Sequence, residues 1–177
     1  MRADYEGKTK RDAMTPAGKI MLLGPIGVGK TSLVRRLVFD RFDSDYKTTI
    51  GVDIMSHEVS LPQGGSARLV IWDTDGDFGQ SILTSAYAAG ASGALVVGDV
   101  TRPQTITRVR GLLEGFARLL PECPAFAVFN KIDLAATPAV ESLGFAGVRV
   151  MAASAQTGEG VRDAFASLAA RIFEPRP

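Results

Sequence analysis

A glycine-rich stretch near the start of the chain holds the residues with the clearest chemistry. It reads Gly24-Pro25-Ile26-Gly27-Val28-Gly29-Lys30-Thr31 and matches the P-loop pattern G-x-x-x-x-G-K-[ST]. Glycines let the backbone turn successive N–H groups inward, where they form an anion site at the positive end of the following helix. Lys30 is expected to meet the β- and γ-phosphates of a nucleotide, while Thr31 offers a hydroxyl to Mg²⁺. The predicted phosphate-binding residues are Gly24, Gly27, Val28, Gly29, Lys30, Thr31 and Ser32.

Two more residues are candidates for the magnesium site. Asp73 follows the apolar run Leu69-Val70-Ile71-Trp72 and forms the pattern Asp-x-x-Gly with Gly76. Mg²⁺ keeps several of its water molecules, so this carboxylate is expected to bind the ion through water. Thr49 lies on the long loop before the second strand and could close over the ion, although a loop threonine is more often a turn residue or a cap.

A second polar motif indicates which base the nucleotide carries. The segment Asn130-Lys131-Ile132-Asp133 directly follows an apolar run, so it emerges at the carboxyl edge of the sheet, where ligands bind in open α/β folds. Asp133 can accept two hydrogen bonds there, from the ring N–H and the exocyclic amine of guanine, and adenine offers neither group in that place. A solvated turn is the alternative reading of this motif. The segment Ser154-Ala155-Gln156 follows the last strand and completes the predicted pocket for GTP or GDP.

Strands and helices alternate along the chain and position these motifs. Apolar runs predict buried parallel strands at 20–23, 94–97, 125–129 and 148–151. Residues 51–60 and 67–72 flank a turn-rich segment and predict an antiparallel hairpin. Apolar residues at helical spacing predict helices at 31–39, 106–120 and 161–172. The predicted fold class is α/β, a mostly parallel six-stranded sheet with one antiparallel hairpin strand and helices on both faces. A P-loop between strand and helix disfavours a chance glycine-rich turn.

Composition narrows the class of protein further. The 177 residues carry a net charge of +1, which argues against a nucleic-acid-binding surface. The single cysteine, Cys123, excludes an internal disulfide and favours a reducing cytoplasm. We expect a monomer with a disordered leader at 1–17 and one domain at 18–174. The last residues contain no cysteine box or polybasic cluster, so no lipid anchor is expected.

Taken together, these motifs resemble those of the Ras-like small GTPases, which have the P-loop NTPase fold. The segments Thr49-Ile50-Gly51-Val52-Asp53 and Asp99-Val100-Thr101 are most similar to the Rab branch. The resemblance implies that Phe42 packs on guanine, Tyr46 covers the phosphates, Thr49 binds Mg²⁺ in the GTP state, and Ala155 N–H donates to the guanine oxygen. It also implies that the segments around Thr49 and Gly76 are switch regions, ordered by the γ-phosphate, through which effector and regulatory proteins bind.

The chain departs from the family pattern at three places. Asp77 stands where the family has the glutamine that orients the attacking water, and Asp75 stands where alanine is usual. An ionised carboxylate cannot donate a hydrogen bond and faces a polyanion, so it is a poor substitute. Ile26 occupies a P-loop position that the family usually keeps small. Only 24 positions separate Asn130 from Ser154, which predicts a short helix between them.

The expected function is therefore a GTPase switch whose hydrolysis is slow or partner-dependent. The catalytic candidates are Lys30, Thr49, Gly76 and Asp77. A protonated Asp77 with a raised pKa is one route to activity, because nearby phosphate favours the neutral carboxyl. A GTP-binding interaction module with little or no hydrolysis is the alternative function. A P-loop kinase or ATPase is disfavoured because the Asn130–Asp133 segment selects guanine.

Overall fold

The protein folds around a single six-stranded sheet. The computed structural model describes residues 15–42, 49, 51–74, 86–134 and 144–175. The strands are β1 (Ala17–Leu23), β2 (Val52–Ser60), β3 (Ser66–Thr74), β4 (Ala91–Asp99), β5 (Ala125–Asn130) and β6 (Val150–Ala152). Their order across the sheet is β2-β3-β1-β4-β5-β6. Only the β2–β3 pair is antiparallel, so the predicted fold class and hairpin are confirmed.

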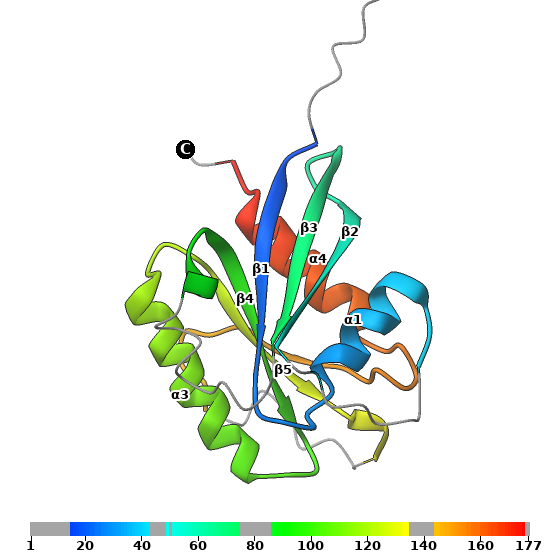
Figure 1. Ribbon diagram of the computed structural model, residues 1–177, viewed down its shortest axis with the longest axis vertical. Coiled ribbons are helices and arrows are strands. Elements are labelled where there is room, and N and C mark those ends of the chain that lie inside the picture. The colour runs from blue at the N-terminus through cyan, green and yellow to red at the C-terminus, as the bar shows by residue number, and fades with distance from the viewer. Residues whose placement is uncertain (1–14, 43–48, 50, 75–85, 135–143, 176–177) are drawn as a thin grey trace, which may run out of the picture.

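Helices cover both faces of this sheet, as Figure 1 shows. Helices α1 (Lys30–Phe39) and α4 (Val161–Ile172) pack on one face, and α3 (Gln104–Leu119) packs on the other. Successive side chains of β1 alternate between the two resulting cores: Ile20 and Leu22 face α1 and α4, while Met21 and Leu23 face α3. Nearly all of β4 is buried because it is covered from both sides.

The predicted elements differ from the observed ones mainly at their ends. β1 begins at Ala17, the last residue of the predicted leader, because its backbone pairs with β3 from the Ala17–Arg68 position onward. β4 extends beyond its apolar core to Asp99, and β6 is limited to three residues. The predicted short helix between Asn130 and Ser154 falls partly at 135–143, outside the described residues. The described part of that segment contains a single 3-10 turn, η3 (Ile132–Leu134).

The parallel strands place several loops at one edge of the sheet. The carboxyl ends of β1, β4 and β5 lie together at the lower edge in Figure 1, where the P-loop follows β1 and η3 follows β5. A second 3-10 turn, η2 (Ala86–Ala88), precedes β4. Within the described ranges, no helix has the length and hydropathy needed to cross a bilayer.

Candidate nucleotide-binding site

The phosphate loop, residues 24–29, has a backbone that only glycine can follow at two of its positions. Gly24 has φ 145° and Gly29 has φ 94°. A Cβ on Gly24 would lie 2.3 Å from Val97 O, and a Cβ on Gly29 would lie 2.3 Å from Asn130 Nδ2. Both contacts are shorter than real Cβ atoms allow, so these glycines are required by both conformation and space.

Lys30 extends from the first turn of α1 back along this loop. The side chain is buried, and Nζ donates to Gly24 O at 2.8 Å and to Pro25 O at 3.2 Å. A buried ammonium needs compensating oxygen atoms, and the loop carbonyls supply them. The charge of Lys30 is thereby kept inside the curve of the loop, where a phosphate group can meet it.

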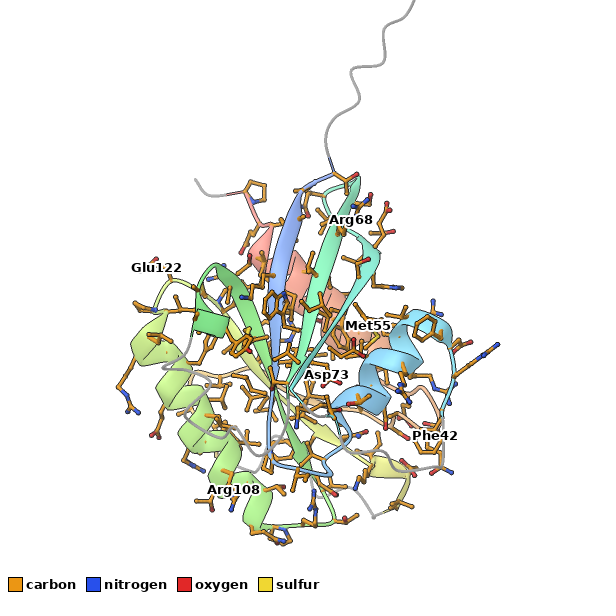
Figure 2. All side chains as sticks on the ribbon, in the orientation of Figure 1. Phe42, Met55, Arg68, Asp73, Arg108 and Glu122 are labelled. Carbon is orange, nitrogen blue, oxygen red and sulfur yellow. The ribbon has the colours of Figure 1, made fainter. Side chains whose placement is uncertain are left out.

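Three oxygen-bearing side chains converge beside the start of α1. Thr31 Oγ1 lies 2.7 Å from Thr49 Oγ1 and donates to Asp73 Oδ2 at 2.5 Å. Asp73 lies at the centre of the molecule in Figure 2, at the end of β3 and next to α1. The sequence placed these three residues at one magnesium site, and the structure brings all three together.

The environment of Asp73 fits a nearby cation. Its side chain is fully buried, and no group in the described part of the chain donates a hydrogen bond to Oδ1. Burial raises the pKa of Asp73 to about 6, although the Thr31 hydrogen bond and the Lys30 charge act in the opposite direction. A buried carboxylate oxygen without a donor is costly unless a ligand compensates it. Thr31, Thr49 and Asp73 thus fit Mg²⁺, with hard oxygen donors of the kind this ion prefers.

The base-recognition motifs are bound to each other and to the phosphate loop. Asn130 is buried, and its Nδ2 donates to Val28 O at 2.9 Å. Lys131 Nζ donates to Gly27 O at 2.9 Å. Asp133 Oδ1 accepts a hydrogen bond from Ser154 Oγ at 2.5 Å. Hydrogen bonds therefore join the loops that follow β1, β5 and β6 at one edge of the sheet.

Ala155 has an unexpected hydrogen-bond partner. The resemblance assigns its N–H to the guanine oxygen, but in this structure the N–H donates to Asn130 Oδ1 at 3.0 Å. Ala155 is buried, whereas Gln156 and the 40%-exposed Phe42 lie on the surface. The N–H group that the resemblance assigns to guanine is therefore already hydrogen-bonded within the protein in this structure.

Other predicted residues lie outside the described part of the chain. These are Tyr46, Gly76 and Asp77, together with Asp75. Ser32 is half-buried within α1, and Ile26 is 38% exposed on the phosphate loop.

A second set of polar residues, to which the sequence motifs assign no site role, supports the site. Arg36 of α1 donates from Nε to Ala155 O and from Nη2 to Gln156 O. Asp99, at the end of β4, is fully buried and accepts hydrogen bonds from Lys131 and Arg102. Asp99 lies at the carboxyl end of a central strand, and this position could have indicated from the sequence that it belongs to the site. Arg36 lies 119 residues from Ala155 in the sequence, and no sequence pattern indicates that the two are in contact.

Comparison with known proteins decides the family. The family model described as "Ras family" matches residues 19–174. The chain belongs to the Ras family. Ras-related protein Rab-18-B of Danio rerio is 36% identical over 163 residues, which cover 88% of this chain and 79% of that protein. Ras-related protein Rab-36 of Mus musculus is 36% identical over 166 residues, covering 88% of this chain and 62% of that protein.

Family membership confirms the main functional prediction. This Ras-family protein is a GTP-binding switch GTPase, with GTP or GDP and Mg²⁺ as its ligands. The Rab names of both relatives agree with the Rab-like segments found in the sequence. Members of the family interact with effectors and regulators.

Proposed function

We propose that this GTPase retains guanine nucleotide tightly, hydrolyses GTP slowly on its own and depends on a partner for efficient turnover. Retention is supported by one observation above all: three loops that follow different strands are joined at one sheet edge. Asn130 and Lys131 each reach a carbonyl of the phosphate loop, and Asn130 also accepts from Ala155 N. A nucleotide that spans these loops contacts a site already held in shape, so little ordering is needed on binding.

Each residue of the site has a distinct proposed role. Lys30 binds the β- and γ-phosphates, and the N–H groups of residues 27–29 surround them. Thr31 and Thr49 would hold Mg²⁺ directly and Asp73 would hold it through water, and the ion when bound would supply positive charge to the phosphate oxygens. Asp133 recognises guanine, with Ser154 Oγ fixing the orientation of its carboxylate.

Slow hydrolysis is supported by two residues of the sequence. Asp77 stands at the position from which a glutamine orients water, and it cannot donate a hydrogen bond while ionised. Ile26 adds a branched side chain to the phosphate loop, where it crowds a water-orienting group or an arginine from an activating partner. The same residues favour the alternative, an interaction module with little or no hydrolysis. Hydrolysis rates with and without an activating partner separate the two functions.

A competition experiment tests the base assignment. Labelled GDP bound to the full chain should be displaced by unlabelled GDP and not by ATP. Asp133→Asn replaces an acceptor by an amide that donates to a carbonyl, so its affinity for GDP should fall by at least about a hundredfold, while xanthosine diphosphate becomes the preferred ligand. Equal displacement of GDP by ATP from the wild type would contradict the assignment.

Several finer points stay predictions. We propose that effectors and regulators bind through the segments around Thr49 and Gly76, and that the protein is a monomer in the cytoplasm. Light scattering of the GDP-loaded and GTP-loaded protein tests the oligomeric state, and a dimer in either state would overturn it.

A further inference from the structure

Every backbone carbonyl of the phosphate loop, residues 24–29, accepts a hydrogen bond. Lys30 Nζ donates to Gly24 O and Pro25 O, and the backbone N–H of Leu33 donates to Gly29 O. Donors that are distant in the sequence bind the middle of the loop: Lys131 Nζ donates to Gly27 O, and Asn130 Nδ2 donates to Val28 O. The remaining carbonyl, Ile26 O, accepts from Arg102 Nη2 at 3.0 Å. Arg102 belongs to none of the nucleotide-binding motifs.

Except at Gly24 O, which is followed by the N–H-less Pro25, each of these bonds also fixes the direction of an N–H group. The C=O of one residue and the N–H of the next belong to the same planar trans peptide and point in opposite directions. A donor that holds Ile26 O outward therefore turns Gly27 N–H inward, toward the anion. Gly27 has φ 73° and no side chain to restrict rotation of this peptide, so an external hold is needed.

Arg102 is itself held firmly. Its Nε donates to Asp99 Oδ2 at 3.0 Å, and Lys131 Nζ lies 2.7 Å from the same oxygen. Asp99 Oδ1 accepts from the backbone N–H and the hydroxyl of Thr101. Asp99 is fully buried, so the two cations share a fixed anchor. Arg102 and Lys131 thus reach adjacent phosphate-loop carbonyls, Ile26 O and Gly27 O, from one carboxylate.

We propose that Arg102 is a positioning residue of the phosphate site: it orients the Ile26–Gly27 peptide and thereby sets how long nucleotide stays bound. Its guanidinium bridges Asp99 and Ile26 O with separate nitrogen atoms, which a lysine ammonium cannot reproduce in the same geometry. Loss of the bridge frees the peptide to rotate and weakens the contact between Gly27 N–H and phosphate. Among the described residues, no hydrogen bond joins Arg102 to Asp133, Ser154 or Ala155, so we expect guanine recognition to be retained when Arg102 is replaced.

The test compares Arg102→Gln and Arg102→Lys with Arg108→Gln, which removes the same charge from an exposed site on α3 (Figure 2). Dissociation of labelled GDP from the full chain is measured with Mg²⁺ present, and guanosine is tested as a competitor that lacks phosphate. We expect both Arg102 variants to release GDP faster, by about tenfold for Gln, with guanosine affinity unchanged. The Arg108→Gln variant should match the wild type.

Three results would overturn the inference. The first is an unchanged rate of GDP release in both Arg102 variants. The second is a wild-type rate of GDP release in Arg102→Lys, which would show that charge alone matters. The third is a parallel loss of GDP and guanosine affinity, which would show general destabilisation. If Arg102→Gln does not fold, the lysine variant carries the test. Failure of the wild type to bind GDP would instead contradict the nucleotide-binding function itself.

Discussion

Two buried aspartates at the site have opposite surroundings. Asp73 accepts a hydrogen bond from the Thr31 hydroxyl and feels the charges of Lys30 and Asp53, and burial raises its pKa to about 6. Burial alone would also raise the pKa of Asp99, but hydrogen bonds from Lys131 and Thr101 outweigh it, so the pKa lies below its ordinary value. Asp73 is therefore suited to receive a cation from solution, whereas Asp99 already has two from the protein.

The low pKa of Asp99 gives its contribution to stability a defined pH dependence. The ionised carboxylate, faced by Lys131 and Arg102, stabilises the fold above its unfolded pKa of about 4, and this stabilisation is lost as pH falls through the lower folded value. Asp99→Asn should lower the free energy of unfolding at pH 7 by about 2 kcal/mol. Urea unfolding from pH 7 to pH 3 measures the difference in unfolding free energy between the wild type and Asp99→Asn, which should become smaller below about pH 4. A difference that becomes larger at acidic pH would contradict this assignment.

At this scale, sequence patterns singled out the residues that we expect to face the ligand and missed those that support them. Lys30, Thr31 and Asp133 belong to motifs whose spacing is typical of contact with phosphate, metal and base. Arg36 and Arg102 instead reach main-chain carbonyls that any residue could provide. Such contacts impose no residue type on the partner position, so no spacing rule reveals them.

Among the elements, α1 connects the phosphate loop to the base-binding loop. Its first turn carries Lys30 and Thr31, and Arg36 in its last turn donates to Ala155 O at 2.8 Å and Gln156 O at 2.5 Å. A Cβ on Gly158 would lie 3.6 Å from Arg36 Cδ, so the loop also packs on the arginine stem. Helix α1 therefore holds both ends of the nucleotide site in fixed relation.

Loss of the Arg36 contacts should weaken binding of the base. We expect Arg36→Gln to raise the dissociation rate of GDP by about tenfold and to weaken guanosine to a similar degree, unlike the Arg102 variants. Arg41→Gln removes the same charge from an exposed position just past α1 and serves as the control. Stopped-flow release of labelled GDP measures the rates. Unaltered guanosine affinity in Arg36→Gln would rule out this role.

Two glycines allow the effect of backbone strain to be compared with that of a steric clash: Gly24 in the loop after β1, and Gly64 in the turn between β2 and β3. Gly24 and Gly64 both have positive φ, but only at Gly24 would an added Cβ strike a backbone atom, Val97 O. Gly64→Ala should cost about 1 kcal/mol in unfolding free energy, and Gly24→Ala about 3 kcal/mol or more, with loss of GDP binding. Thermal and urea unfolding provide the comparison. Equal costs would mean that the loop can move away from β4.

The elements themselves followed from apolar periodicity. Runs such as Ala125–Phe129 predicted buried strands because continuous burial on both faces leaves no alternation. The ends of strands were less predictable: Asp99 and Asn130 are polar, yet pairing with neighbouring strands extends β4 and β5 to include them. Backbone hydrogen bonds to a neighbour, which carry no mark in the local sequence, set those ends.

At the scale of the whole molecule, the sheet separates two apolar cores from one polar edge. The cores lie under α1 and α4 on one face and under α3 on the other. Polar side chains from β3, β4 and β5 gather at the carboxyl edge, where Asp73, Asp99 and Asn130 are all buried. Nucleotide binding at this edge joins loops from both halves of the sheet, so it should also stabilise the fold.

The central claim is that the protein binds guanine nucleotide well and hydrolyses GTP poorly without a partner. Single-turnover hydrolysis of bound GTP, measured for the wild type beside Asp77→Gln, tests it most directly. We predict that the wild type retains most of its GTP while the glutamine variant converts it at least about tenfold faster, because glutamine can both donate to and accept from the attacking water. Rapid conversion of GTP to GDP by the wild type alone would contradict the account.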